Sequence, residues 1–309
     1  MTLRLGLMFA GQGAQFPGMG SDLYDAFPAA RAVFDRADAI LGRSVSQLCF
    51  RGTAEELTAS ANCQPAIYTM SLACLAALRE AAAFEQVVCG GLSLGEFGAL
   101  TAAGALDVRE GLPLVAKRGE LMDEACRATD GAMAAVLGAD PDLVSRVCSD
   151  CGMDVANDNC PGQRVISGAS SSLDAAVSML AREGVKKVVK LNVAGAFHSR
   201  LMQPAADGFA PVLDACTFQQ PACPVAQNVK GGLVESPDEM RENLKAQVTG
   251  SVRWHDCVAA MMGLELDMLV EVGPGSVLSG FMKRIDRRFP VARAGKADDI
   301  RTLAEKLNQ

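Results

Sequence analysis

The chain has 309 residues, of which 50% are hydrophobic and 21% are charged. This composition is typical of a globular protein with a large core, and it excludes a disordered or collagen-like chain. The 29 basic and 36 acidic residues give a formal net charge of −7. An acidic chain argues against nucleic acid as the main partner, because phosphate binding needs a basic surface.

The cysteines and the apolar segments favour a cytoplasmic location. The 11 cysteines are an odd number scattered along the chain, which is typical of reduced thiols rather than of a disulfide scaffold. The one CxxC pair, Cys148 and Cys151, lies far from the two histidines, so we predict no metal site. No segment reaches the ~18 continuous apolar residues of a membrane helix, and we interpret the apolar start of the chain as a buried strand.

Residues 1–126 alternate between strand and helix patterns, which favours an α/β fold with a mainly parallel sheet. A strand at 4–10 leads into a Gly/Gln loop, and a strand at 86–89 leads into the sequence GGLSLGE. Both loops follow strands, the position where α/β proteins place functional residues. The other apolar patterns predict helices at 21–39, 64–83, 107–126 and from GGLSLGE to Ala105.

Residues 127–195 follow a different pattern. Strands are predicted at 131–137, 153–157, 163–167 and 187–193, and helices at 141–148 and 171–183. The order β-α-β-β-α-β is the ferredoxin-like arrangement. We therefore predict a small ferredoxin-like domain at 127–195, inserted into a larger α/β core made of 1–126 and 196–309.

The α/β pattern resumes in the last third of the chain. Gly273-Pro274-Gly275 is predicted to be a structural turn rather than an anion site. The patterns predict strands at 225–229 and 268–272, and helices at 201–214, 237–247, 254–262 and 277–285.

Ser93 is the candidate nucleophile, because residues 91–95 (GLSLG) fit the G-x-S-x-G nucleophile elbow. In an elbow the serine lies on a strained strand-to-helix turn, and small neighbours let the backbone bend. The helix that follows favours negative charge at its start. The alternative is a Gly-rich turn with a buried serine, but the preceding strand and the long following helix favour the elbow.

A serine nucleophile needs a base, and only His198 and His255 are available. His198 follows a predicted strand, whereas His255 lies at the start of a predicted helix. Functional residues gather in loops at the carboxyl ends of parallel strands. We therefore favour His198 as the base over its alternative, a capping or surface histidine.

Two backbone amides are candidates for an oxyanion hole. The N–H of Leu94 follows the serine, and the N–H of Gln12 lies in the loop after the first strand. A dinucleotide fingerprint in that same loop is disfavoured, because Phe16 stands where a third glycine or an alanine is needed.

Taken together in chain order, six motifs resemble those of the malonyl-CoA:acyl-carrier-protein transacylases, acyltransferases of fatty acid and polyketide synthesis. They are GQGAQFPGMG, GLSLGEFGALTAAGAL, KRGELM, VANDNCPGQRVISG, GAFHSRLM and VEVGPGSVLSG, which run from Gly11 to Gly280. The resemblance implies a hydrolase-like α/β core carrying the ferredoxin-like insert, with the active site in the cleft between them. One position departs from the family pattern: Leu92 stands where GHSLGE has histidine.

The resemblance also implies roles for individual residues. Ser93 and His198 match the nucleophile and base, and the amides of Gln12 and Leu94 match the oxyanion hole. Arg118 matches the arginine that pairs with the malonyl carboxylate, although its sequence position beside Lys117 alone would favour an exposed helical arginine. Gln247 falls where a backbone carbonyl holds the histidine. Phe197 would narrow the pocket and favour malonyl over methylmalonyl, its alternative being a core phenylalanine.

The implied reaction is a ping-pong transfer in which malonyl-CoA acylates the serine and the thiol of an acyl carrier protein takes the malonyl group, with no bound cofactor. The alternatives are a serine thioesterase or hydrolase and a non-catalytic carrier-binding module. Carrier proteins are acidic, so docking needs a local basic patch. Asn157 and Asn159 are expected near the cleft, and Glu96 as an acid at a helix start. The candidates for this patch are Arg182, Lys186, Lys187 and Lys190 or Lys283, Arg284, Arg287 and Arg288, and the alternative for each residue, favoured for any single one, is an ordinary solvated face.

Overall fold

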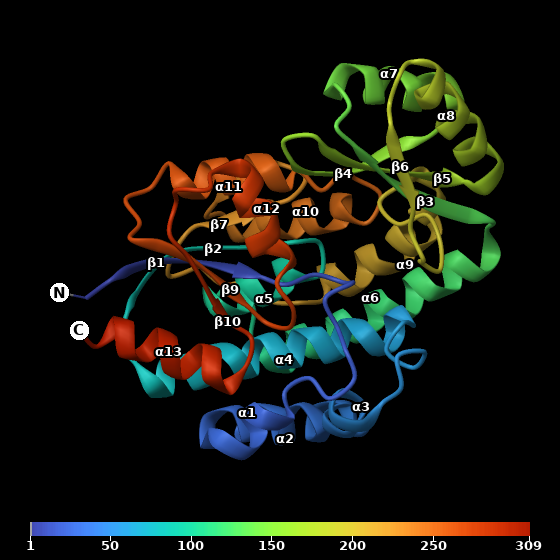
Figure 1. The fold of residues 1–309 in the computed structure, drawn as a ribbon. Helices are drawn as coiled ribbons and strands as arrows, with labels where there is room; N and C mark the ends of the chain where they lie inside the picture. The colour runs from blue at the N-terminus through green and yellow to red at the C-terminus, as the bar shows by residue number, and fades with distance from the viewer. Residues whose placement is uncertain (1) are drawn as a thin grey trace.

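The computed structural model describes residues 2–309, which form two sheets and their covering helices (Figure 1). The larger sheet has the strand order β10-β9-β1-β2-β7-β8. Its neighbouring strands run parallel except β8, which is antiparallel to β7. The predicted mainly parallel α/β sheet is therefore confirmed. The strands are β1 (Arg4–Phe9), β2 (Glu85–Gly91), β7 (Val225–Gln227), β8 (Gly232–Val234), β9 (Met268–Val272) and β10 (Val291–Ala294).

Helices cover both faces of this sheet. They are α1 (Ser21–Ala26), α2 (Pro28–Leu41), α3 (Val45–Arg51), α4 (Ser60–Ala81), α5 (Gly95–Ala102), α6 (Val108–Ala128), the 3₁₀ turn η1 (Arg200–Met202), α9 (Gln203–Asp214), α10 (Pro237–Gln247), α11 (Trp254–Met262), α12 (Val277–Ile285) and α13 (Ala297–Leu307). In β1, Leu7 and Phe9 pack into the core that contains α4 and α6, whereas Met8 packs into the core that contains α11 and α12. Successive side chains of a strand point to opposite faces, so a continuous apolar strand fills both cores. In Figure 1, α4 and α13 lie below the sheet and α11 and α12 above it.

The second sheet is antiparallel and has the order β4-β5-β3-β6. With its helices it follows the predicted ferredoxin-like order β-α-β-β-α-β. The two helices pack on one face and enclose a separate apolar core around Val136 and Ile166 (upper right in Figure 1). Its elements are β3 (Gly131–Leu137), α7 (Pro141–Cys151), β4 (Asp154–Cys160), β5 (Gln163–Ala169), α8 (Ser170–Arg182) and β6 (Lys187–Lys190).

The two sheets are joined through β4. Val252, which lies just before α11, pairs with Asn157 in an isolated parallel bridge. The Val252 N–H donates to the Ala156 carbonyl at 2.8 Å, and its carbonyl accepts from the Asp158 N–H at 2.9 Å. These backbone bonds hold β4 against the end of the larger sheet where β1 and β2 finish.

Several predicted elements were wrong in extent; for example, the strand predicted at 153–157 runs to Cys160 as β4. The helix predicted at 21–39 is two helices, because Pro28 begins α2 and forces the preceding Phe27 into an extended conformation (φ −128°). The strand predicted at 187–193 ends at Lys190, and the strand predicted at 225–229 ends at Gln227. In both cases the chain leaves the sheet to form a loop that lines or supports the site described below.

Four elements were missed: α3, β8, β10 and α13. The strands have only three and four residues, too short for an alternating pattern to stand out. Helix α13 begins at Ala297 without a side-chain cap. Strand β10 forms one edge of the larger sheet by pairing with β9, and α13 follows it at the C-terminus.

Candidate active site

Ser93 lies on a sharp turn between β2 and α5, at φ 51°. A non-glycine residue in this left-handed region carries strain of about 1–3 kcal/mol. The glycines on either side make the turn possible: a Cβ at Gly91 would lie 2.0 Å from the carbonyl carbon of Gly95, and a Cβ at Gly95 would lie 2.2 Å from the Phe9 carbonyl oxygen. The G-x-S-x-G spacing therefore reflects two positions where the backbones touch.

The hydroxyl of Ser93 and the ring of His198 meet across 105 residues of sequence. The distance from Ser93 Oγ to His198 Nε2 is 2.7 Å. On the other side of the ring, Nδ1 lies 2.9 Å from the Gln247 carbonyl oxygen and 3.2 Å from that of Gly250. Two carbonyls accept from an N–H, so Nδ1 carries the proton and Nε2 is free to accept one from the serine.

Burial and the charge of Arg118 lower the pKa of His198 to about 4, against a smaller upward effect of the two carbonyls. The imidazole is therefore neutral at neutral pH, which is the form that can act as a base. No carboxylate contacts Nδ1 in the part of the chain that the structure describes. The pair is thus a dyad oriented by backbone carbonyls.

Arg118 is buried, with 1% of its surface exposed, so the exposed arginine favoured by sequence position alone was wrong. Helix α6 directs its guanidinium to the elbow, where Nη2 donates to Ser93 Oγ at 3.1 Å and to Gln247 Oε1 at 2.9 Å. Nη1 donates to Gln64 Oε1 at 2.8 Å, and the guanidinium carbon lies 5.5 Å from the centre of the Phe97 ring.

Every hydrogen-bond partner of this guanidinium is neutral. Burial lowers the pKa of Arg118 to about 10, so the group stays charged at neutral pH. Its Nε atom has no hydrogen-bond partner within residues 2–309. A buried cation without a carboxylate in direct contact is suited to pair with an anionic ligand, and a guanidinium does so with a planar fork.

Gln247, the last residue of α10, contacts the site through both its backbone and its side chain. Its carbonyl faces the ring of His198, its Oε1 accepts from Arg118, and its Nε2 donates to the Ser93 carbonyl at 3.0 Å. Only the carbonyl contact was expected. One residue thus links the candidate base, the cation and the elbow.

The two candidate oxyanion donors lie in loops that the sheet places side by side. Strands β1 and β2 are parallel neighbours, with Phe9 opposite Gly91, so the loops carrying Gln12 and Leu94 leave the same edge. The N–H groups of Gln12 and Leu94 form no hydrogen bond with residues 2–309. Free backbone amides beside the serine are the donors that an oxyanion needs.

A cleft of about 310 Å³ opens above Ser93. Its floor comes from loops of the larger sheet, which bring Gln12, Ser93, Phe197 and His198 into its lining. One wall comes from the antiparallel sheet, and Val277 and Phe281 of α12 form another. The lining includes Asn157 and Asn159, as expected from the sequence.

The comparisons with known proteins agree with this geometry. A model of the acyl transferase domain family matches residues 7–298. The malonyl CoA-acyl carrier protein transacylase of Bacillus subtilis (strain 168) is 38% identical over 311 residues, covering 99% of this chain and 98% of the relative. The chain belongs to the malonyl-CoA:acyl-carrier-protein transacylase family.

Solved structures of this family have the same fold. The acyl-carrier-protein S-malonyltransferase of Bartonella henselae superposes with a TM-score of 0.94 at 34% identity over the full length of both chains. A malonyl-transacylase solved with its type II polyketide synthase acyl-carrier protein also gives a TM-score of 0.94, at 34% identity, covering 98% of this chain and 99% of that one.

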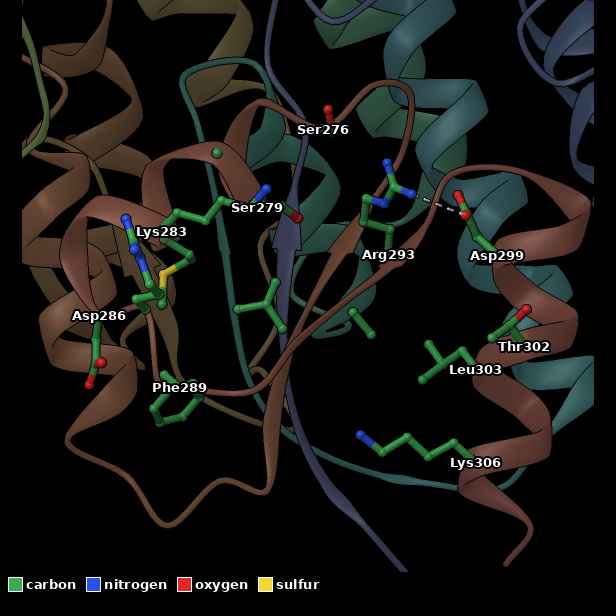
Figure 2. A pocket seen from close by; sticks show the side chains of 15 residues that line it. Ser276, Ser279, Lys283, Asp286, Phe289, Arg293, Asp299, Thr302, Leu303 and Lys306 are labelled. Atoms are coloured by element: carbon green, nitrogen blue, oxygen red, sulfur yellow. Dashed lines mark ion pairs between the residues drawn. The ribbon is translucent and has the colours of Figure 1, made fainter.

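This transacylase family member has a second, larger hollow of about 760 Å³. It lies between α12, β10 and α13, outside the cleft that contains Ser93 (Figure 2). Lys283 of α12 and Asp286, which follows the end of that helix, line the hollow, and Arg293 pairs with Asp299 across its upper end at 3.7 Å. Lys283 and Arg287 of a predicted docking patch line it, but none of the catalytic, oxyanion-hole or acyl-binding residues predicted from the sequence does. The smaller cleft, which contains Ser93 and His198, is therefore the candidate active site.

Sequence reasoning missed the buried polar residues behind the elbow. The sequence suggests Glu96 only as an acid at a helix start, and the residue does lie in the first turn of α5. It is also fully buried, and burial raises its pKa to about 7. Its carboxylate accepts from Gln227 Nε2 at 2.9 Å and from the Asn228 N–H at 2.8 Å. The partners lie more than 130 residues away, so no local pattern could reveal them.

Residues 2–309 contain neither a metal-binding cluster nor a membrane-spanning helix. No group of three or more His, Cys, Asp or Glu side chains is arranged to hold a metal ion. No helix within that range has the length and apolar character needed to cross a membrane.

Proposed function

We propose that this protein transfers the malonyl group of malonyl-CoA to the phosphopantetheine thiol of an acyl carrier protein, through an acyl-enzyme on Ser93. The observation that carries the proposal is the double contact of the Ser93 hydroxyl, with His198 Nε2 at 2.7 Å and with Arg118 Nη2 at 3.1 Å. A base and an unneutralised cation at one hydroxyl fit an acyl group that carries a carboxylate.

In the first half-reaction, His198 Nε2 takes the proton of Ser93 as Oγ attacks the thioester carbonyl. The oxygen that becomes negative would lie at the N–H groups of Gln12 and Leu94. Collapse of the tetrahedral intermediate breaks the carbon–sulfur bond, and the protonated His198 gives its proton to the departing CoA thiolate. The malonyl ester on Ser93 remains.

The second half-reaction runs the same steps with a different thiol. His198 accepts the proton of the phosphopantetheine thiol as the sulfur attacks the Ser93 ester. Expulsion of Oγ then returns the proton to the serine. We propose that neither half needs a resident cofactor, because the donor and the product are both thioesters of similar energy.

Arg118 would select the acyl group by pairing with its free carboxylate. Burying a carboxylate without a partner is costly, and the guanidinium supplies both charge and a two-point fork. Phe197, which is 7% exposed and lines the cleft, would narrow the space at the α-carbon. We therefore propose malonyl in preference to methylmalonyl.

The carrier protein would dock on the rim of the cleft beside α12. Leu191, Val193 and Val277 line the cleft and are among the large hydrophobic side chains exposed in residues 2–309. The same helix carries the basic end that begins at Lys283. An apolar rim next to basic side chains suits an acidic partner that inserts a thiol.

Of the two basic patches predicted from the sequence, the one at 283–288 fits this role better. Lys283 and Arg287 are exposed and form no ion pair within the described chain. The other patch also holds unpaired cations, since Lys190 is the one member of it with an ion pair in the described chain, to Asp174 at 2.5 Å. The patch at 283–288 is preferred because it continues α12, whose Val277 and Phe281 line the cleft.

Residues 127–195 are proposed to be a separate inserted domain, because they contain the whole antiparallel sheet and its own apolar core. The cytoplasm is the proposed compartment, because all 11 cysteines are free thiols.

The experiment that tests the function is intact-protein mass spectrometry after mixing with malonyl-CoA. We expect a single malonyl adduct, mapped by peptide analysis to Ser93, which persists in buffer and disappears when a carrier protein with a free phosphopantetheine thiol is added. Rapid release of free malonate in buffer alone would indicate the hydrolase alternative. No adduct at all would indicate the non-catalytic binding module.

A further inference from the structure

Asn228 lies where the pairing between β2 and β7 ends. The last backbone pair of these parallel strands is Gly90 with Ala226, and Asn228 follows β7 directly. Its side-chain amide continues the pairing: Oδ1 accepts from the Ser93 N–H at 2.6 Å, and Nδ2 donates to the Gly91 carbonyl at 2.8 Å. The side-chain amide thus takes the place of one more peptide unit alongside the strand.

These two bonds span the turn that presents the nucleophile. They hold the residue before and the residue after Leu92, and Ser93 has a backbone conformation that an L-residue rarely adopts (φ 51°). Gly91 and Gly95 leave room for the turn, but a glycine has no side chain with which to hold it. A residue that bonds both sides of the turn can hold it in place.

The backbone of Asn228 is itself fixed from behind. Its N–H donates to Glu96 Oε2 at 2.8 Å, and its carbonyl accepts from the Arg253 N–H at 3.0 Å. Glu96 lies in the first turn of α5, the helix that begins two residues after Ser93. Asn228 and Glu96 are both fully buried, so these bonds do not compete with water.

We propose that Asn228 is a positioning residue, which holds the Ser93 turn so that Oγ stays in contact with His198. It touches no atom of a substrate and acts only through the serine. The inference depends on the proposed function only in taking Ser93 as the nucleophile.

The first test compares Asn228→Ala and Asn228→Asp with the unmodified protein. We expect the rate constant for acylation by malonyl-CoA to fall about 10- to 100-fold, since small displacements of a reacting group have effects of that order. The concentration of malonyl-CoA at half-saturation should change less than twofold, because Asn228 does not contact Arg118. Asn62→Asp is the matched control: Asn62 Nδ2 donates to the Glu56 carbonyl at the surface, and acylation should be unchanged.

The second test uses pH to restore the missing donor. A carboxylate at position 228 can accept from the Ser93 N–H but cannot donate to the Gly91 carbonyl, whereas a neutral carboxylic acid can do both. The acylation rate of Asn228→Asp, divided by that of the unmodified protein at the same pH, should therefore rise at least fivefold from pH 8 to pH 5.5. Glu96, Arg118, His198 and Cys257 surround this position in both proteins, so the ratio removes the pH dependence that the unmodified protein also shows.

A fluorophosphonate probe separates this inference from the malonyl assignment, because it labels an activated serine whatever the natural acyl group. Slower labelling of Ser93 in both variants, with a rising pH ratio for Asn228→Asp, supports the inference even if malonyl-CoA fails to react with the unmodified protein. Labelling within twofold of the unmodified rate, or a ratio independent of pH, would overturn it. If Asn228→Ala does not fold, the pH ratio of Asn228→Asp decides.

Discussion

The floor and the walls of the cleft are built in different ways. On the floor lies His198, and behind it lie Arg118 and Gln247; all three are buried and connected to Ser93 by hydrogen bonds. On the walls and rim, Leu191 and Val277 expose apolar side chains to solvent. The comparison suggests that the floor determines the chemistry, because buried polar groups act in a low dielectric, and that the rim determines which partner approaches.

The largest effect is expected from removing the nucleophile on the floor. Ser93→Ala should lower malonyl transfer by at least ~10³-fold, because the acyl-enzyme can no longer form. Ser178→Ala, at a serine on the exposed face of α8 whose Oγ bonds the Asp174 carbonyl, should leave transfer unchanged. Stopped assays with labelled malonyl-CoA measure both. A folded Ser93→Ala protein that still transfers malonate would contradict the nucleophile assignment.

Arg118→Ala should remove ~1.5–3 kcal/mol of transition-state stabilisation, the scale of a hydrogen bond to a charged group, or about 10- to 150-fold in kcat/KM for malonyl-CoA. Transfer of acetyl, which lacks the carboxylate, should be much less affected. Lys117→Ala is the neighbouring control, because Lys117 is directed away from the site toward Glu120. Equal losses for the two acyl groups would argue against the pairing.

The pH profile tests the depressed pKa of His198. A pKa of about 4 leaves about nine-tenths of the imidazole neutral at pH 5, whereas an ordinary value near 6.5 would leave only about 3%. The acylation rate should therefore stay nearly constant from pH 8 to pH 5 and decline only as the pH falls through about 4. Rapid-quench measurements in short pH jumps would show this. A decline centred near pH 6.5 would mean that the ring is not desolvated as the structure indicates.

The smallest effect is expected at the rim. Lys283→Glu combined with Arg287→Glu should raise the KM for the carrier protein a few-fold, more at low ionic strength, because exposed charges mainly affect association. Acylation by malonyl-CoA should not change. Arg182→Glu, in the other basic patch, is the matched control and should have little effect on either step. If Arg182→Glu raised the KM for the carrier protein more than the Lys283→Glu and Arg287→Glu double variant did, the docking surface would be assigned to the patch that contains Arg182.

Much of the architecture could be read from local patterns. Helix α10 was predicted with its observed bounds because Ser236 caps it and Pro237 begins it, and β9 because it is a short apolar run ending at a Gly-Pro-Gly turn. The break at Pro28 was missed, although a residue before proline avoids the helical conformation. The edge strand β10 was also missed, because four residues carry too little periodicity.

The site was only partly readable for the same reason. The G-x-S-x-G motif marks Ser93 because the turn itself demands small residues at Gly91 and Gly95, within five positions. His198 followed from its place after a strand. Nothing near Arg118 in the sequence distinguishes it from the exposed Lys117; only packing of α6 against α4 and the end of α10 decides that it is buried.

The sequence by itself determined the strand–helix order, the strained serine turn and the family, since these depend on residues close together or on motifs in a fixed order. The tertiary structure alone decided which polar groups meet: Asn228 with both sides of the turn, Glu96 with Asn228, Gln247 with Arg118. Those contacts join segments from 129 to 137 residues apart. Their existence depends on how strands β2 and β7 pair and where α10 ends, which local propensity does not encode.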